Sequence, residues 1–234
     1  MPLLICASTT QELAALFPDA AETPTREMQL LPARLKNREA LLCVTGVGPI
    51  NAALAAGLCF ARAEAENRPV RAVLNSGLAG AFDLRRLPLC SLCLAREEIW
   101  PEYGLHDGQS VTADAFSFPL WRRDDGTETR DRLPLDGPEV LGGTKTAVFA
   151  ECRSLTVAGV SASFVRAQTL WNRYHADMEN MEGFAVAYAC ARQGVPCVEL
   201  RCIANKVGPR ARDEKDFPGA LNALAGILPA LNLL

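Results

Sequence analysis

Short, almost purely apolar runs alternate with segments of helical periodicity along this chain of 234 residues. The apolar runs have the length of buried strands, and we expect strands at residues 3–7, 41–47, 72–76, 89–95, 147–149, 155–161 and 197–204. Helices are predicted at residues 9–17, 50–64, 164–174, 181–193 and 217–233. Apolar strands that alternate with amphipathic helices are typical of an α/β/α sandwich, whose sheet is covered on both faces.

The whole chain, residues 1–234, is expected to form a single domain, because no linker separates two self-sufficient halves. Residues 122–143 interrupt the pattern, since they are charged, rich in Gly and Pro, and almost free of periodicity. We expect a surface excursion there, either a loop or a short hairpin. The loop at residues 77–81 is expected to follow the third strand.

Composition excludes several classes of protein. The formal net charge of −3 supplies no basic field, so we expect no nucleic-acid partner. No apolar run approaches the roughly 20 residues that span a bilayer, and the first residues lack the basic start of a signal peptide, so no membrane partner is expected either. Nine cysteines, mostly inside apolar runs, indicate reduced thiols in a cytoplasmic protein and no disulfide framework.

Ligands of open α/β sheets bind beyond the carboxyl ends of the strands. This rule selects residues 7–12, 45–48, 75–80, 161–164 and 204–206. Gly46-Val47-Gly48 lacks the third glycine of a dinucleotide-binding loop, so no nicotinamide cofactor is predicted. Cys90-Ser91-Leu92-Cys93 is a lone CxxC pair that we interpret as small buried side chains, and no metal site is predicted.

Two glutamates at predicted helix starts are candidates for chemistry. Glu182 precedes a strongly apolar helix, and by itself it fits capping and a functional role equally well. Glu12 follows Thr9 at the spacing of a capping box, and this pattern alone favours capping.

Four segments in this order resemble the nucleoside phosphorylase and nucleosidase superfamily, which contains methylthioadenosine nucleosidase. They are residues 45–53, 75–80, 180–185 and 200–205, and together they span nearly the whole chain. Within the superfamily the chain is most similar to the futalosine hydrolase family, on the features Gly77-Leu78-Ala79-Gly80-Ala81-Phe82, Glu179-Asn180-Met181-Glu182-Gly183, and Asn205 followed by Gly208-Pro209-Arg210-Ala211-Arg212. The resemblance implies a mixed central sheet, a homo-oligomer, and an N-glycosyl hydrolase that needs no cofactor.

The resemblance also implies roles for the matching residues. Glu12 would activate the attacking water, and Glu182 would accept hydrogen bonds from the ribose hydroxyls, with Met181 packed beneath the sugar. The residues implied at the base or beside it are Leu78, Ala79, Gly80, Phe164 and Asn205. Arg210 and Arg212 would pair with the benzoate of futalosine or remain solvated loop charges.

Asn205 lies where relatives that act on aminopurines carry Asp. An amide can donate to purine N7 and to a 6-oxo oxygen, so Asn205 favours a leaving group such as hypoxanthine. Phosphorylases of this fold hold phosphate with arginines near the first strand's end and a Ser in the glycine loop. Here Ala7-Ser8-Thr9-Thr10 contains no Arg and the loop position is Leu78, so water is expected as the nucleophile.

The expected function is therefore hydrolysis of the N-ribosidic bond of futalosine to hypoxanthine, in menaquinone biosynthesis. A phosphorylase or a methylthioadenosine-type nucleosidase of the same fold is the nearest alternative. A purine-binding protein without turnover is an alternative from another class, and a nicotinamide-dependent oxidoreductase is a more distant one.

Overall fold

Nine strands form one mixed sheet at the centre of the computed structural model, which describes residues 1–17, 24–36, 38–108, 110–142, 147–209, 211 and 214–234. Eight of them follow the order β10-β5-β11-β12-β4-β1-β3-β2, and β13 pairs with both β4 and β5. Their bounds are β1 Leu3–Ala7, β2 Leu30–Leu35, β3 Arg38–Val44, β4 Ala72–Ala81, β5 Leu92–Ile99, β10 Arg132–Pro134, β11 Ala150–Thr156, β12 Met178–Asn180 and β13 Cys197–Lys206.

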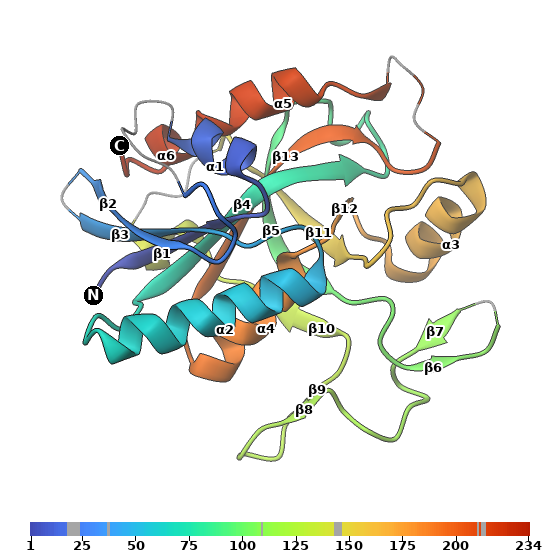
Figure 1. Ribbon diagram of the computed structural model, residues 1–234. Helices are drawn as coiled ribbons and strands as arrows, with labels where there is room; N and C mark the ends of the chain where they lie inside the picture. The colour runs from blue at the N-terminus through green and yellow to red at the C-terminus, as the bar shows by residue number, and fades with distance from the viewer. Residues whose placement is uncertain (18–23, 37, 109, 143–146, 210, 212–213) are drawn as a thin grey trace.

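Helices cover both faces of this sheet, as predicted (Figure 1). Helices α1, α5 and α6 lie on one face, α2 and α4 lie on the other, and α3 packs at the end of the sheet near β12. Their bounds are α1 Thr10–Leu16, α2 Pro49–Ala65, α3 Phe164–Tyr174, α4 Gly183–Gln193, α5 Phe217–Leu224 and α6 Ile227–Ala230, with a 3-10 turn at Pro138–Leu141.

The alternation of side chains along each buried strand divides the core into two layers. In β1, Leu4 and Cys6 belong to the apolar cluster that includes α2 and α4. Leu3 and Ile5 point the other way and pack with α1, α5 and α6. Because both sets are fully buried, β1 is apolar at every position, which is why its sequence shows no polar alternation.

Five of the strands close into a ring. β4 pairs with β13, β13 with β5, β5 with β11, β11 with β12, and β12 with β4 again. Parallel and antiparallel pairs both occur in this ring, since β12 and β13 run in opposite directions relative to β4. The ring brings the carboxyl end of β4 next to the end of β13 and the start of α4, where the candidate site lies.

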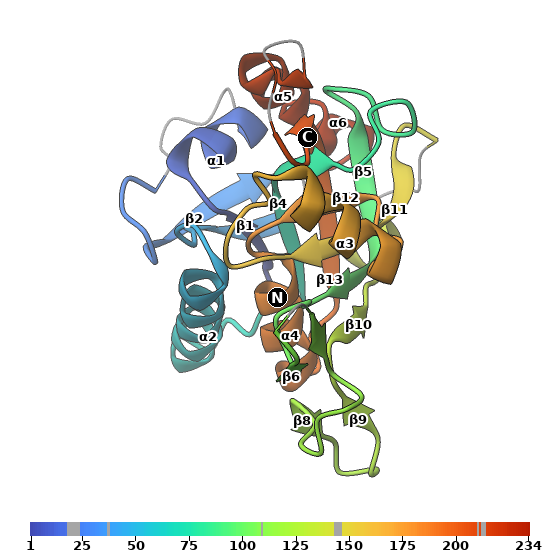
Figure 2. The same ribbon diagram turned by 90° about the vertical axis from the view of Figure 1, so that its right-hand side faces the viewer.

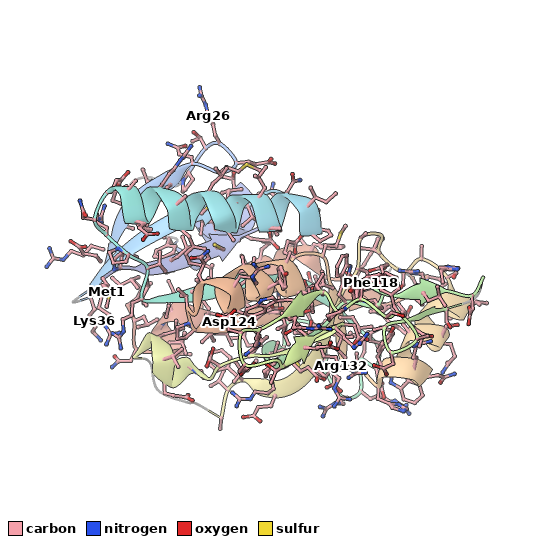
Figure 3. The ribbon with its side chains drawn as sticks, turned by 90° about the horizontal axis from the view of Figure 1, so that it is seen from below. Met1, Arg26, Lys36, Phe118, Asp124 and Arg132 are labelled. Carbon is pink, nitrogen blue, oxygen red and sulfur yellow. The ribbon has the colours of Figure 1, made fainter. Side chains whose placement is uncertain are left out.

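The region between β5 and β11 extends away from the sheet, below α4 (Figure 2). It contains two short hairpins, β6 Leu105–His106 with β7 Val111–Thr112, and β8 Trp121–Arg122 with β9 Glu128–Thr129. The view from below places Phe118 and Asp124 in this excursion, beside α4 (Figure 3). Trp121 meets Tyr188 of α4 edge to face. The predicted excursion at 122–143 therefore begins with a hairpin, but Arg132–Pro134 joins the central sheet as an edge strand.

Several predicted boundaries are wrong. Residues 77–81 are not a loop, because β4 continues through them and pairs with β13 as far as Lys206 and with β12. The predicted strands at 147–149 and 155–161 are a single strand, β11, between them. The first residues of the helix predicted at 181–193 precede α4, which begins at Gly183, and the helix predicted at 217–233 is divided into α5 and α6.

All nine cysteines are free, and eight of them are buried. Cys93 is buried as expected, whereas Cys90 is half-buried and precedes β5 with a left-handed backbone. In the described part of the chain, no helix combines the length and the apolar character needed to cross a membrane.

Candidate active site

Seven of the predicted site residues line one cavity of about 190 Å³ at the carboxyl ends of the strands. They come from α1, β4, the start of α4 and the end of β13, and they are Glu12, Leu78, Ala79, Gly80, Met181, Glu182 and Asn205. Val47, Val160 and Phe217 add apolar surface to the same cavity. The sheet thus brings together residues that lie far apart in the sequence.

Glu12 both caps its helix and faces the cavity. Its Oε2 accepts hydrogen bonds from the Thr9 amide at 2.9 Å, the Thr9 hydroxyl at 2.8 Å and the Ser8 hydroxyl. The Thr9 side chain accepts from the Glu12 amide in return, so the predicted capping box is present. The other oxygen, Oε1, accepts from the amide of Leu78 at 2.8 Å. The capping contact therefore aims one carboxylate oxygen at β4.

Gly77 makes the approach of Glu12 to β4 possible. A Cβ atom at this position would lie 2.7 Å from Glu12 Oε1 and 2.9 Å from Arg201 Nη1. Both distances are shorter than real carbon contacts, so a larger residue would push the carboxylate away from the strand. The glycine stretch is thus part of β4 and serves close packing between a strand and two charged side chains.

Glu182 lies at the N-terminus of α4, only 5% exposed. Its Oε1 accepts from the amide of Gly48 at 3.0 Å, and its Oε2 lies 3.5 Å from Arg201 Nη1. Burial raises the pKa of Glu182, while Arg201 and the Gly48 amide oppose that shift. The Glu182 carboxylate makes no capping hydrogen bond to α4, so capping by this side chain, one of the two interpretations that the sequence left open, is not observed. The carboxylate lines the cavity instead.

Asn205 lies opposite Gly80 at the end of β13, one residue before the last pair, and is 7% exposed. Its Nδ2 donates to the backbone carbonyl of Lys206 at 2.7 Å. One amide hydrogen is therefore used on the protein, and one N–H and the carbonyl oxygen remain for a ligand. In this geometry Asn205 has one N–H left to donate, whereas the expected hydrogen bonds to purine N7 and to a 6-oxo oxygen need two.

One predicted substrate-binding residue, Phe164, does not line this cavity. Phe164 begins α3, is 70% exposed, and lines a separate cavity of about 970 Å³ with Phe82, Arg85 and Trp171. Its predicted stacking on the base has no support in this arrangement. Arg210, together with Arg212, lies outside the described residues.

Sequence reasoning missed Arg201, which is 1% exposed and lies directly behind the cavity. Its Nε donates to Glu199 at 3.0 Å, and its Nη1 faces Glu182. Burial lowers the pKa of this guanidinium, but the surrounding carboxylates, Glu199 foremost, outweigh burial and raise it. The signal was present in the sequence, because Glu199 and Arg201 are charged residues two apart in an otherwise apolar strand and must share one face.

Among the described residues, no group of three or more His, Cys, Asp or Glu side chains is arranged to hold a metal ion. The acidic side chains at the cavity instead accept hydrogen bonds from amides, hydroxyls or a guanidinium. Their chemistry suits the binding of hydroxyl groups and the transfer of protons.

A sequence model of the Phosphorylase superfamily matches residues 3–226. The chain belongs to the phosphorylase superfamily. Futalosine hydrolase of Streptomyces coelicolor is 34% identical over 184 residues, which cover 78% of this chain and 74% of that protein. Futalosine hydrolase of Thermus thermophilus is 35% identical over 187 residues, with coverage of 77% and 76%. These matches confirm the resemblance and the expected class of enzyme, an N-glycosyl hydrolase.

A further relative is aminodeoxyfutalosine nucleosidase of Campylobacter jejuni, 29% identical over 192 residues. Among solved structures, the 5'-methylthioadenosine/S-adenosylhomocysteine nucleosidase from Helicobacter pylori has a TM-score of 0.76 at 20% identity and covers 99% of this chain and 97% of that chain. A futalosine hydrolase mutant of Helicobacter pylori has a TM-score of 0.76 at 21% identity, with coverage of 99% and 98%. These structures confirm the predicted α/β fold with a mixed central sheet.

Proposed function

We propose that this enzyme hydrolyses the N-ribosidic bond of futalosine and releases hypoxanthine, as a step of menaquinone biosynthesis. One observation carries the proposal: Glu12 and Glu182, distant in sequence, line one cavity together with the amide of Asn205. The substrate follows from the futalosine hydrolases that the chain resembles over about three quarters of its length.

Glu12 is the general base of the proposed reaction. Its negative charge is stabilised by donors from Ser8, Thr9 and Leu78, which also fix its orientation. Water held by Glu12 attacks the anomeric carbon, and Glu12 takes up the proton of that water. The bond between the anomeric carbon and the purine nitrogen breaks, and its electron pair leaves with the base. The base takes a proton from solvent water to become hypoxanthine, and Glu12 returns its proton to solvent.

Glu182 binds the ribose hydroxyls and stabilises the positive charge that develops on the sugar. Ribosidic cleavage passes through an oxocarbenium-like state, in which a nearby anion strengthens its interaction as charge appears. Arg201 and the Gly48 amide hold the carboxylate in place before the substrate arrives. Met181 packs beneath the sugar, and Asn205 donates one hydrogen bond to the departing base.

Water is the better nucleophile than phosphate in this cavity. None of the described residues that line it is a lysine or an arginine, so a phosphate dianion would lack a cationic partner. Leu78 occupies the position at which phosphorylases carry Ser, and its side chain offers no donor. These features support hydrolysis over phosphorolysis.

The second candidate function is hydrolysis of a nucleoside whose base carries a 6-amino group. A relative named aminodeoxyfutalosine nucleosidase matches 79% of this chain, so a 6-amino base is the alternative leaving group. The amide of Asn205 has one donor left, which suits a 6-oxo oxygen, and one acceptor, which suits a 6-amino group. The 6-oxopurine substrate is the one proposed because relatives named futalosine hydrolase match this chain at 34% and 35% identity, against 29% for the aminodeoxyfutalosine nucleosidase.

The test is an assay of base release from futalosine, aminodeoxyfutalosine, inosine and methylthioadenosine, with and without phosphate. We expect hypoxanthine from futalosine at the highest kcat/KM and no dependence on phosphate. Faster release with phosphate, together with a ribose phosphate product, would identify a phosphorylase. Preference for an amino base would replace futalosine by its amino relative.

A further inference from the structure

A cluster of buried polar side chains lies behind the candidate site, and all five strands of the closed ring contribute to it. β4 supplies Asn75, β5 supplies Glu98, β11 supplies Ser154 and Thr156, β12 supplies Asn180, and β13 supplies Glu199 and Arg201. Each of these side chains is at most 4% exposed. We call these seven residues the ring cluster. The reaction described above uses none of their carboxyl groups directly.

Asn180 is the central residue of the ring cluster. Its Nδ2 donates to Glu98 Oε1 at 2.6 Å and to Glu199 Oε1 at 3.3 Å. Its Oδ1 accepts from the amides of Glu182 and Gly183 at 2.8 and 2.7 Å, and from Arg201 Nη2 at 3.2 Å. The start of α4, including the backbone of Glu182, is therefore held by the same amide that contacts both buried carboxyl groups.

The two carboxyl groups of the ring cluster lie next to each other. A Cβ atom added to Gly183 would overlap both Glu98 Oε1 and Glu199 Oε2, so these two oxygens flank a single point. Both side chains are fully buried. Two carboxylates at such a distance cannot both be ionised without a large electrostatic cost, and one proton shared between them removes that cost.

Hydrogen-bond partners distinguish the two carboxyl groups. Glu199 accepts from the guanidinium of Arg201 at 3.0 Å and therefore has a cation of its own. The described residues that donate to Glu98 are neutral: Asn180, Thr156 and Ser154. Burial raises the pKa of Glu98 well above its ordinary value, and Glu199 raises it further. These contacts favour the charged form of the Glu199 side chain and the protonated form of the Glu98 side chain.

Arg201 is the cation of the ring cluster, and its single positive charge limits how many carboxylates beside it can be ionised. The ionisable groups around it are Glu98 from β5, Glu199 from its own strand, Glu182 from the start of α4 and Glu12 from α1. Arg201 contacts Glu199 through Nε and Glu182 through Nη1. A second anion in the ring cluster would compete with Glu182 for the same cation.

We propose that Glu98 is a neutral carboxylic acid that donates its proton to Glu199, and that this shared proton keeps Arg201 directed at Glu182. Glu98 and Glu199 are thus positioning residues, acting on the sugar-binding carboxylate through Arg201 and Asn180. The positioning role rests on the proposed nucleosidase function, whereas the shared proton does not.

Three single variants test this proposal. Glu98→Gln replaces a neutral acid by a neutral amide of the same shape, which still donates to Glu199. Glu199→Gln removes the anion that holds Arg201. Glu97→Gln is the matched control, because Glu97 is the neighbour of Glu98 on β5 but pairs with Arg132 and Arg153 at the surface.

The first measurement is the infrared spectrum of each full-length protein at neutral pH, without substrate. We expect the carbonyl stretch of a protonated carboxylic acid in the parent, its loss in Glu98→Gln, and its retention in Glu97→Gln. If Glu98→Gln leaves that band unchanged, the proposal is overturned. This readout needs no activity, so it decides on the proton even if the enzyme cleaves none of the proposed nucleosides.

The second measurement is kcat/KM for base release. We expect Glu98→Gln to remain within about threefold of the parent and Glu199→Gln to lose about 10- to 100-fold, the effect of one hydrogen bond between charged groups. Equal losses in both variants would overturn the positioning role. If Glu199→Gln does not fold, the infrared spectrum and the kcat/KM of Glu98→Gln still test the proposal. A large loss of kcat/KM in Glu98→Gln would contradict a neutral Glu98.

Discussion

At the residue scale, the two oxygens of Glu12 have different tasks. Oε2 accepts three hydrogen bonds at the start of α1, and Oε1 reaches the amide of Leu78 on β4. A local capping motif therefore fixes the direction of a long-range contact. The same argument applies to Glu182, whose helix start is held by Asn180 while its carboxylate meets Gly48 and Arg201.

Glu12→Gln should preserve the fold and abolish most of the turnover. Glutamine at this position can still close the capping box through its oxygen, but its amide nitrogen cannot accept from the Leu78 amide, so we expect a folded protein with a slightly lower melting temperature. It accepts no proton from water, and kcat should fall about 10²- to 10⁴-fold. Single-turnover and steady-state release of hypoxanthine from futalosine measure this. Full activity in the variant would point to another base, and parent and variant that bind purines without turnover would point to a binding protein.

Protonation of Glu182 should set an acid limit on activity. Burial raises the pKa of this carboxyl, so it becomes neutral at a higher pH than an exposed glutamate. The neutral form offers the ribose hydroxyls less negative charge, and kcat/KM should fall as the pH decreases through that raised pKa. The pH profile of kcat/KM measures it, with circular dichroism as the control for folding. An acid limb at the pKa of an ordinary glutamate would contradict this assignment.

Asn205→Asp should shift the preference of the enzyme toward 6-amino bases. A carboxylate accepts from the amino group, whereas the amide of Asn205 donates to a 6-oxo oxygen. We expect the ratio of kcat/KM for aminodeoxyfutalosine to that for futalosine to rise about tenfold or more, the effect of one hydrogen bond to a charged group. Asn222→Asp, at an exposed position of α5, is the control. An unchanged ratio in Asn205→Asp would remove Asn205 from base selection.

At the scale of elements, the sequence predicted the buried strands well where both faces are apolar. β1 and α3 have the predicted bounds, because their patterns depend on local neighbours only. The glycine-rich end of β4 was predicted as a loop, since glycine disfavours strands in isolation. Its extended conformation depends on β12 and β13, which lie more than 90 residues later in the chain. No local pattern reports such pairing.

Part of the candidate site was also accessible from sequence. The resemblance selected Glu12, Glu182 and Asn205, and the fold brings them to one cavity. Phe164 was selected by the same resemblance but faces a different cavity, because the direction of a side chain at a helix start depends on how α3 packs. The ring cluster was missed because its members lie on five strands, each of which contributes only one or two residues to it.

Gly183→Ala, at the first residue of α4, should destabilise the protein. The added methyl group would overlap the carboxyl groups of Glu98 and Glu199. Overpacking of this kind costs about 1–3 kcal/mol in the free energy of unfolding. Gly57→Ala is the matched control, because a Cβ at Gly57 in α2 meets nothing within 4 Å and should stabilise by about 0.4–1 kcal/mol. Urea unfolding of both variants checks the opposite signs.

At the scale of the whole molecule, a group of exposed apolar side chains is a candidate contact surface for a second copy of the chain. Val47, Ile50 and Leu54 are 50%, 83% and 52% exposed. Val47 precedes α2 and lines the cavity, and Ile50 and Leu54 follow one turn apart in α2, so we call these three residues the apolar strip. The expected homo-oligomer would bury this strip against a second copy. An exposed apolar surface beside an active site is otherwise unfavourable in water.

Ile50→Glu should therefore dissociate the oligomer. A charge at the most exposed position of the strip opposes its burial against another apolar surface. Light scattering coupled to size exclusion should show a lower molar mass than that of the parent. Val148→Glu, at another exposed apolar position, is the control and should leave the mass unchanged. A monomeric parent would contradict the expectation directly.

The closed ring of strands also governs when the enzyme can become active during its own synthesis. Glu12 and the β4 residues leave the ribosome early, but β11 is made in the second half of the chain, and β12 and β13 follow it. Until those strands emerge, β4 has no partner along its glycine-rich end, and Arg201 and Glu182 do not yet exist. Non-local pairing of this kind is slow and comes late in folding. A nascent chain thus acquires its sheet closure and its catalytic pocket together, and a prematurely terminated chain acquires neither.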